Sequence, residues 1–214
     1  DKLVTGVQTC ALPIYPAFVG LHVARNADIS LKLCAKRDPF EGLGVVAVRD
    51  GLSTMIEYTE LTREQATRTT ASGDLYFKYG SVAIHLFSYA FLKAEAHRPM
   101  PLHVAHKKIP VCDASGTVVK PTTNNGYKFE KFIFDVMPDA KTVVNLAFDR
   151  ADEFSPVKNA EGVDSPATCK ADLQAKWRRW LAASGVQVPV ALPIEIDPAY
   201  ALDAADLKKG LSFR

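Results

Sequence analysis

Apolar and polar residues alternate over several short stretches of this 214-residue chain, and a period of two predicts β-strands. Residues 29–35, Ile-Ser-Leu-Lys-Leu-Cys-Ala, show this alternation. Two β-rich stretches, 44–48 and 53–58, flank the tetrapeptide Arg-Asp-Gly-Leu at 49–52, and an Asp-Gly pair between strands favours a tight hairpin. Residues 141–148 form an apolar run typical of a buried strand. These stretches predict the strands of a sheet.

Helical spacing of apolar residues and helix-end signals mark a second set of segments. Thr62 is followed three residues later by Gln65, which is the capping-box pattern of a helix start. Gly185 indicates the end of a helix. Trp177 and Trp180 are expected to form one core-facing stripe rather than a surface that stacks on bases. Helices are predicted over residues 17–27, 63–69, 81–96, 164–183 and 204–209.

The remaining segments have weaker patterns. Residues 103–120 are predicted to form a strand, a turn at 113–116 and a second strand, and residues 191–196 a short strand in a Pro-rich tail. The aromatic stretch 129–137 fits a helix or a strand, because periodicity does not distinguish the two in a short apolar run. Mixed strands and helices indicate an α/β or α+β architecture.

Composition then restricts the class of protein. With 48% hydrophobic residues and a formal net charge of +2, the chain is expected to be globular and not a dedicated nucleic-acid binder. No apolar run approaches the roughly 20 residues that a membrane span needs. The four cysteines are widely spaced and the five histidines show no metal-ligand spacing, so no metal site is predicted. Free thiols favour a cytoplasmic location.

The first residues carry a pattern of a different origin. Residues 4–14, Val-Thr-Gly-Val-Gln-Thr-Cys-Ala-Leu-Pro-Ile, resemble the translation of a short-read sequencing adapter. They lack the charged start and the cleavage site of a signal peptide, and a natural β-like terminus is the alternative. We therefore expect residues 1–14, Cys10 included, to be non-native, with the native chain entering near Tyr15.

Local chemistry points to one loop. The sequence lacks G-x-S-x-G, H-E-x-x-H, Walker A and G-x-G-x-x-G motifs. Lys158 stands in a Pro-containing loop just after the predicted strand 141–148. Loops at the carboxyl ends of strands bind ligands in α/β proteins, and a lysine there suits a phosphate. A solvated surface lysine is the alternative, and His85, among apolar neighbours, is interpreted as a packing residue.

Six collinear segments carry a resemblance to a known family. In chain order they are Gly44-Val-Val, Ile56-Glu57-Tyr58, Tyr79-Gly80-Ser81-Val-Ala-Ile-His85, Lys107-Lys108-Ile-Pro110, Gly126-Tyr-Lys128-Phe-Glu-Lys-Phe132-Ile-Phe134-Asp135 and Asp152-Glu-Phe-Ser-Pro-Val-Lys158-Asn159. Their order and spacing resemble the C-terminal half of the UDP-N-acetylglucosamine pyrophosphorylases, within the eukaryotic-type UDP-sugar uridylyltransferases. The resemblance covers residues 15–165 well and the tail more loosely.

The resemblance implies a fold and a division of the chain. The implied fold is α/β: the C-terminal part of a Rossmann-like nucleotidyltransferase, with a mixed sheet flanked by helices, plus a small C-terminal α+β extension. Residues 15–163 are then the sugar-binding half of the nucleotidyltransferase domain, and residues 164–214 are the extension.

The implied reaction joins UTP and N-acetylglucosamine 1-phosphate to give UDP-N-acetylglucosamine and pyrophosphate, with Mg²⁺ as the cofactor. Such catalysis rests on positioning and charge neutralisation. The expected partners are UTP or a UDP-sugar and a sugar 1-phosphate, with no nucleic acid and no membrane. The oligomeric state stays open.

Matching positions imply roles on the sugar side. Gly44 matches a glycine whose backbone approaches the sugar, and Glu57 matches a glutamate that accepts hydrogen bonds from sugar hydroxyls. Phe132 and Phe134 match aromatic residues that line the pocket of the N-acetyl group. Ser81 departs from the family pattern, which has a sugar-binding Asn there, so the identity of the sugar stays open.

Two lysines match the phosphate side. Lys158 matches the lysine that contacts the phosphates and is the expected catalytic residue, and Lys128 matches a basic residue near the same phosphates. The family's Gly-rich nucleotide loop and its metal-holding Asp have no counterpart in this sequence. The chain alone is therefore expected to be inactive. A UDP-glucose or other UDP-sugar pyrophosphorylase, or a non-catalytic sugar-nucleotide-binding protein, is the alternative for the parent.

Overall fold

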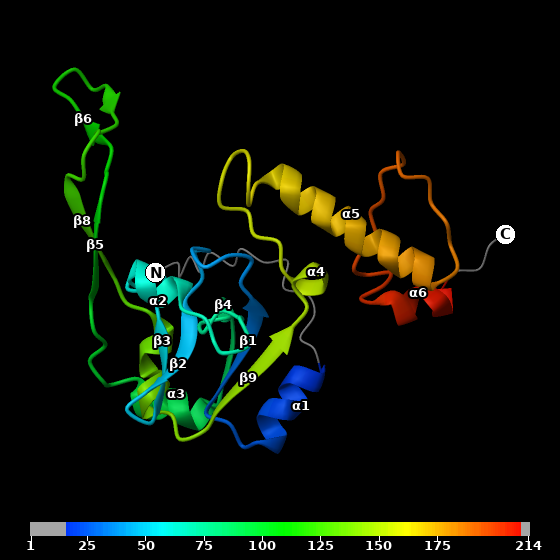
Figure 1. Ribbon diagram of the computed structural model, residues 1–214, viewed down its shortest axis with the longest axis horizontal. Coiled ribbons are helices and arrows are strands. Elements are labelled where there is room, and N and C mark those ends of the chain that lie inside the picture. The colour runs from blue at the N-terminus through cyan, green and yellow to red at the C-terminus, as the bar shows by residue number, and fades with distance from the viewer. Residues whose placement is uncertain (1–15, 211–214) are drawn as a thin grey trace.

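The computed structural model describes residues 16–210, with side chains through Leu207 (Figure 1). The adapter-like residues 4–14 lie outside this range. A mixed five-stranded sheet forms its centre. In spatial order the strands are β3 (Leu52–Ile56), β2 (Val45–Arg49), β4 (Tyr79–Phe87), β1 (Ile29–Ala35) and β9 (Val143–Phe148).

Helical segments flank this sheet (Figure 1). They are α1 (Pro16–Ala24), α2 (Arg63–Thr67), α3 (Tyr89–Glu95), the 3-10 helix η1 (Ile133–Asp139) and α4 (Arg150–Glu153). β1 runs parallel to β9 and antiparallel to β4, so the sheet is mixed. The predicted α/β class, with a mixed sheet flanked by helices, is confirmed.

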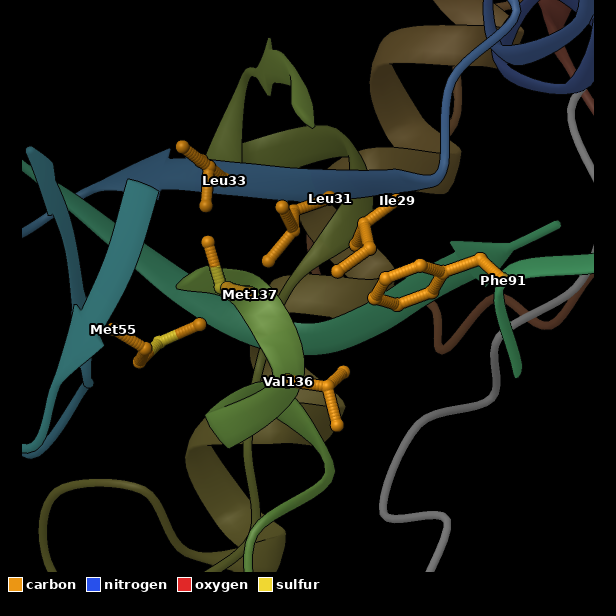
Figure 2. Close-up of a cluster of buried hydrophobic side chains, with 7 residues drawn as sticks. All are labelled: Ile29, Leu31, Leu33, Met55, Phe91, Val136 and Met137. Atoms are coloured by element: carbon orange, nitrogen blue, oxygen red, sulfur yellow. The ribbon is translucent and has the colours of Figure 1, made fainter. Parts of the chain in front are cut away.

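One face of β1 packs the main apolar core. Ile29, Leu31 and Leu33 alternate along the strand and point to the same side, as the period of two predicts. Figure 2 shows these side chains meeting Met137 of η1 and Phe91 of α3. Residues distant in sequence therefore hold η1 against the sheet.

The other face of β1 carries polar residues that are also buried. Ser30 is fully buried, and its hydroxyl lies 2.8 Å from Nδ1 of His22 on α1. Lys32 is 2% exposed and forms an ion pair with Glu153 of α4. A buried charge needs such a partner, because removal from water is costly.

Two local signals in the sequence are confirmed. Asp50 and Gly51 have φ values of 53° and 81°, the left-handed conformation that a tight hairpin turn between β2 and β3 requires. At α2, the Thr62 side chain accepts a hydrogen bond from the Gln65 N–H at 3.2 Å. The Gln65 side chain accepts one from the Thr62 N–H at 2.9 Å, which completes the capping box.

The helix predicted over 81–96 is wrong, because the segment divides into β4 and α3 at Ser88. The Ser88 hydroxyl accepts a hydrogen bond from the Phe91 N–H at 3.2 Å and caps α3. Ala83 has a φ of 62° where the pairing of β4 with β1 shifts register. This bulge breaks the apolar alternation, and pairing with a distant strand overrides the local helical spacing.

A long two-stranded ribbon extends from the sheet (Figure 1). It contains β5 (His103–Lys107) paired with β8 (Gly126–Glu130), and β6 (Val111–Cys112) paired with β7 (Val118–Val119). The turn predicted in this stretch is confirmed, since the Asp113 carboxylate accepts two backbone N–H groups there. The ambiguous stretch 129–137 divides between the end of β8 and η1.

The strand predicted over 141–148 forms as β9, but the expectation that it is buried is wrong. It lies at the edge of the sheet and is only half buried. Asn145 and Ala147 are exposed, and the described residues place no strand beyond β9.

The C-terminal part contains α5 (Pro166–Ala183) and α6 (Ala204–Gly210). Trp177 and Trp180 of α5 pack against a buried cluster that includes Leu207 of α6, which confirms the core-facing stripe. None of the helices in residues 16–210 is long and apolar enough to cross a membrane. The division of the chain at residues 163 and 164 stays a prediction.

The strand predicted over 191–196 is wrong. Pro189 and Pro193 have no N–H to donate to a ladder, and no neighbouring strand lies beside this stretch among the described residues. The Arg178 guanidinium instead donates hydrogen bonds to carbonyl oxygens of the segment, at 3.0 Å to Pro189 and 2.9 Å to Val190. The tail is therefore held as an irregular loop against α5.

Candidate functional site

Gly44 and Glu57 face each other beside the β2–β3 hairpin. Val45 pairs with Ile56, so the register places these two residues just beyond the end of the ladder. A Cβ on Gly44 would lie 2.9 Å from Oε1 of Glu57 and 3.0 Å from the sulfur of Met55. The glycine leaves space for the Glu57 carboxylate, because a side chain at this position would displace that flexible group.

Ser81 of β4 lies beside the same glycine. Its N–H donates to the Gly44 carbonyl oxygen at 2.8 Å. Its hydroxyl accepts from the Ala83 N–H at 3.3 Å and lies 3.4 Å from Nε2 of His85. Burial lowers the pKa of His85 to about 4, so the imidazole is neutral at neutral pH. The packing role expected for His85 fits this arrangement, and the structure brings Ser81, Gly44 and Glu57 together.

Two aromatic side chains at the start of η1 form a stack. The rings of Phe132 and Phe134 are stacked with centroids 4.8 Å apart. The ring of His103 lies 4.6 Å from that of Phe132 and is tilted by 51° to it. η1 packs on β3, and Glu57 is the first residue after that strand. The charge of Asp135 on η1 acts on Glu57, so the start of η1 lies near this carboxylate.

The Glu57 carboxyl has an unusual environment. Its pKa is raised by burial first, and then by the negative charges of Glu60, Asp135 and Glu130. The positive charge of His103 opposes this rise. A carboxylate in such surroundings is a strong hydrogen-bond acceptor with few water contacts, which suits recognition of hydroxyl groups.

Lys158 reaches the site from the loop after α4. Its Nζ donates to the Gly42 carbonyl oxygen at 2.9 Å, two residues before Gly44 in the chain. Its backbone N–H donates to the carbonyl oxygen of Asp164 at 2.7 Å, which closes the loop. The side chain is exposed, so the ammonium stays accessible to an anion.

Lys128 lies on the ribbon instead. It is exposed on β8, and its Nζ donates to Oε1 of Glu130 at 2.6 Å. Glu130 is one of the carboxylates that raise the pKa of Glu57, so Lys128 connects to the site only through this charge. The structure therefore brings Lys158 next to the loop that contains Gly42 and Gly44. It leaves Lys128 paired with Glu130 on the ribbon.

An ionic network centred on the buried Glu41 carboxylate supports the loops around Lys158. The Glu41 carboxylate accepts hydrogen bonds from the Arg37 N–H at 2.7 Å and from the Arg150 guanidinium at 2.6 Å. Arg37 also donates to Asp164 at 2.6 Å. The network joins the loop before β2 to the loops after β9, and the sequence offered no local signal for it.

Sequence reasoning also missed three residues next to the aromatic stack. Nε2 of His103 lies 2.9 Å from Oδ2 of Asp135, and Nδ1 of His103 lies 3.3 Å from Oε1 of Glu60. In the sequence, His103 belongs to a set of histidines without metal-ligand spacing, and Asp135 lies in a segment that resembles the family but has no implied role. No sequence signal links positions so far apart.

The described residues do not fit a metal ion. No group of three or more His, Cys, Asp and Glu side chains in this part of the chain is arranged to hold one. The carboxylates around Glu57 are directed at His103 instead.

No protein-family model matches the chain. Among solved structures, the UDP-N-acetylglucosamine pyrophosphorylase of Trypanosoma brucei superposes with a TM-score of 0.73 at 28% identity, over 91% of this chain and 42% of that chain. A putative UDP-N-acetylglucosamine pyrophosphorylase from Entamoeba histolytica gives a TM-score of 0.79 at 32% identity, over 91% of this chain and 50% of that chain.

The fold is α/β and corresponds to part of these two pyrophosphorylase structures. By sequence, the chain is 40% identical over 177 residues to human UDP-N-acetylhexosamine pyrophosphorylase-like protein 1, covering 80% of this chain and 35% of that protein. It is 36% identical over 203 residues to a probable UDP-N-acetylglucosamine pyrophosphorylase of Dictyostelium discoideum, covering 90% and 42%. The chain is thus homologous to part of the UDP-N-acetylglucosamine pyrophosphorylases, and it spans less than half the length of these two relatives.

Proposed function

We propose that this chain carries the sugar-binding side of a uridylyltransferase active site. The parent reaction is UTP plus N-acetylglucosamine 1-phosphate giving UDP-N-acetylglucosamine and pyrophosphate. The observation that carries the proposal is the approach of Gly44 to Glu57 beside the Phe132–Phe134 stack. A close-approach glycine, a carboxylate acceptor and an apolar wall are the parts that a sugar with an acetamido group requires.

Each residue has a proposed role. Glu57 accepts hydrogen bonds from sugar hydroxyls, and Gly44 leaves space for the ring. Phe132 and Phe134 line the pocket of the acetyl methyl group. Ser81 offers a hydroxyl to the sugar at the position where the family has Asn.

Lys158 is the proposed catalytic residue. An oxygen of the sugar phosphate attacks the α-phosphorus of UTP, the bond to the β-phosphate breaks in line, and pyrophosphate leaves. Lys158 exchanges its contact with the Gly42 carbonyl oxygen for a phosphate oxygen and neutralises the developing charge. Lys128 adds positive charge on the same side after release from Glu130.

Mg²⁺ is the cofactor we propose for the parent protein. We also propose that the chain by itself has no uridylyltransferase activity, since the Gly-rich nucleotide loop of the family has no counterpart in its sequence. The free thiols Cys34, Cys112 and Cys169 support a cytoplasmic location.

One observation favours a second sugar. Ser81 is shorter than Asn and is already engaged by Ala83 and His85, so its contact with the sugar differs from the family pattern. UDP-glucose or another UDP-sugar is therefore the alternative product.

Calorimetric titration of the chain with UDP-N-acetylglucosamine and with UDP-glucose tests the proposal. Tighter binding of UDP-N-acetylglucosamine is expected, and Ser81→Asn should increase that preference. Equal, weak binding of both nucleotides would contradict a sugar site. Formation of UDP-sugar by this chain alone would contradict the expected inactivity.

A further inference from the structure

His103 stands where three elements meet, at the base of the ribbon. It is the first residue of β5 and contacts Asp135 of η1 and Glu60 of the loop after β3. Nε2 lies 2.9 and 3.0 Å from the two Asp135 carboxylate oxygens, and Nδ1 lies 3.3 Å from Glu60. Ionised carboxylates only accept hydrogen bonds, so an imidazolium, which carries a proton on each ring nitrogen, is the form of His103 that satisfies both neighbours.

The charges around the ring agree with this state. Glu57 at the end of β3, Glu60 after it, Asp135 on η1 and Glu130 on β8 supply four carboxylates. Lys128 on β8 is paired with Glu130. Burial lowers the pKa of His103, but the hydrogen bonds and charges of Asp135 and Glu60 outweigh burial and raise it.

Asp135 transmits this contact to the aromatic stack. Its Oδ2 also accepts a hydrogen bond from the Phe132 N–H at 3.3 Å, at the start of η1. The His103 ring itself contacts the Phe132 ring in a tilted arrangement, with centroids 4.6 Å apart. The imidazolium therefore holds the turn that carries Phe132 and Phe134, and it offsets part of the negative charge around Glu57.

We propose that His103 is a positioning residue for sugar binding, which clamps Glu60 and Asp135 around a positive charge and thereby orders Phe132 and Glu57. This inference deepens the proposed function and rests on it. Its consequence is that sugar-nucleotide affinity falls as pH rises and the clamp loses its proton.

The test measures the dissociation constant of UDP-N-acetylglucosamine from pH 5.5 to 8.5 for the wild-type chain and for His103→Gln. We expect wild-type affinity to fall with rising pH. His103→Gln should bind about tenfold more weakly at low pH, the size of losing one charge-assisted hydrogen bond, with a flat profile. His106→Gln is the matched control, because His106 lies on the same strand, stacks on Tyr127 at 4.6 Å and is exposed.

A second variant separates positioning from folding. Glu60 is about half exposed, so Glu60→Gln should fold normally while moving the pH midpoint of binding to a lower value. NMR titration of the His103 ring in the ligand-free chain should give a midpoint above 6.5, the ordinary histidine value. A midpoint at or below 6.5, or an unchanged affinity and pH profile in His103→Gln, overturns the inference.

If the proposed function itself is wrong, the same experiments give a different result. In that case the wild-type chain and His106→Gln bind no sugar nucleotide at any pH, although His103 still titrates with a raised midpoint. That result would remove the ligand role of His103 and the sugar site together.

Discussion

The ammonium of Lys158 lies 2.9 Å from the Gly42 carbonyl oxygen, although the two residues are 116 positions apart in the chain. The contact joins the loop after α4 to the loop that enters β2. It places a cation beside Gly44, which lies opposite Glu57. The described structure thus brings the proposed phosphate contact and the proposed sugar contact to one edge of the sheet.

Replacing this lysine should separate phosphate binding from sugar binding. Lys158→Met is expected to weaken UDP-N-acetylglucosamine about tenfold or more, because a charge-assisted contact to phosphate is lost. Calorimetry with the nucleotide sugar and with N-acetylglucosamine checks this, since affinity for the uncharged sugar should hardly change. Lys108→Met, at an exposed position of the ribbon, is the control and should behave as wild type. Equal losses for both ligands would contradict a phosphate contact.

Adding one methyl group at Gly44 should disrupt the sugar site. The new Cβ of Gly44→Ala would lie 2.9 Å from Oε1 of Glu57, so the carboxylate must move away. We expect a clear loss of sugar-nucleotide affinity with the chain still folded. Gly20→Ala is the matched control, because a Cβ there meets nothing within 4 Å. Gly20 lies on α1, so this change should raise helix stability by about 0.5–1 kcal/mol. Unchanged affinity in Gly44→Ala would refute the close approach.

Ionised Glu57 should lower the free energy of unfolding at neutral pH, although its carboxylate contributes to sugar binding. Its folded pKa is raised above the ordinary value of 4.5, chiefly by burial, so ionisation destabilises the fold as pH rises through the folded pKa. Glu57→Gln should therefore melt at a higher temperature than wild type at pH 7. At pH 3.5, where both side chains are neutral, the two melting temperatures should coincide. The variant should also bind the sugar nucleotide more weakly, and a lower melting temperature at pH 7 would reverse the assignment.

The core beneath the site sets the stability of the sheet. Leu31 is fully buried between η1 and α3, so Leu31→Ala should lower the free energy of unfolding by about 2–5 kcal/mol. Chemical denaturation monitored by far-UV circular dichroism measures this change. Val48→Ala is the control, because that side chain on β2 is 72% exposed and should change stability by about 0.5 kcal/mol or less. A similar loss for both would contradict the assigned core.

Local signals predicted the local elements well. The alternation over 29–35 matches the bounds of β1, and the Asp-Gly pair and the Thr62 capping box lie where the structure has a turn and a helix start. The prediction failed at 81–96, where pairing with β1 and the bulge at Ala83 decide the conformation. It failed again at 191–196, where a strand has no partner.

The sequence likewise indicated only part of the candidate site. A resemblance of short segments pointed to Gly44, Glu57, Phe132 and Lys158, because each lies within a quoted motif. It gave no indication of His103, whose partners come from other elements.

The sequence by itself determined the strands and turns whose signals lie within a few residues, and it determined the resemblance to a family of UDP-sugar pyrophosphorylases. Only the tertiary structure decided which distant residues meet. The contacts of Lys158 with Gly42, Arg150 with Glu41 and His103 with Asp135 are examples. The physical reason is that the energies of these contacts depend on burial and on charges supplied by other elements, which local propensity does not contain.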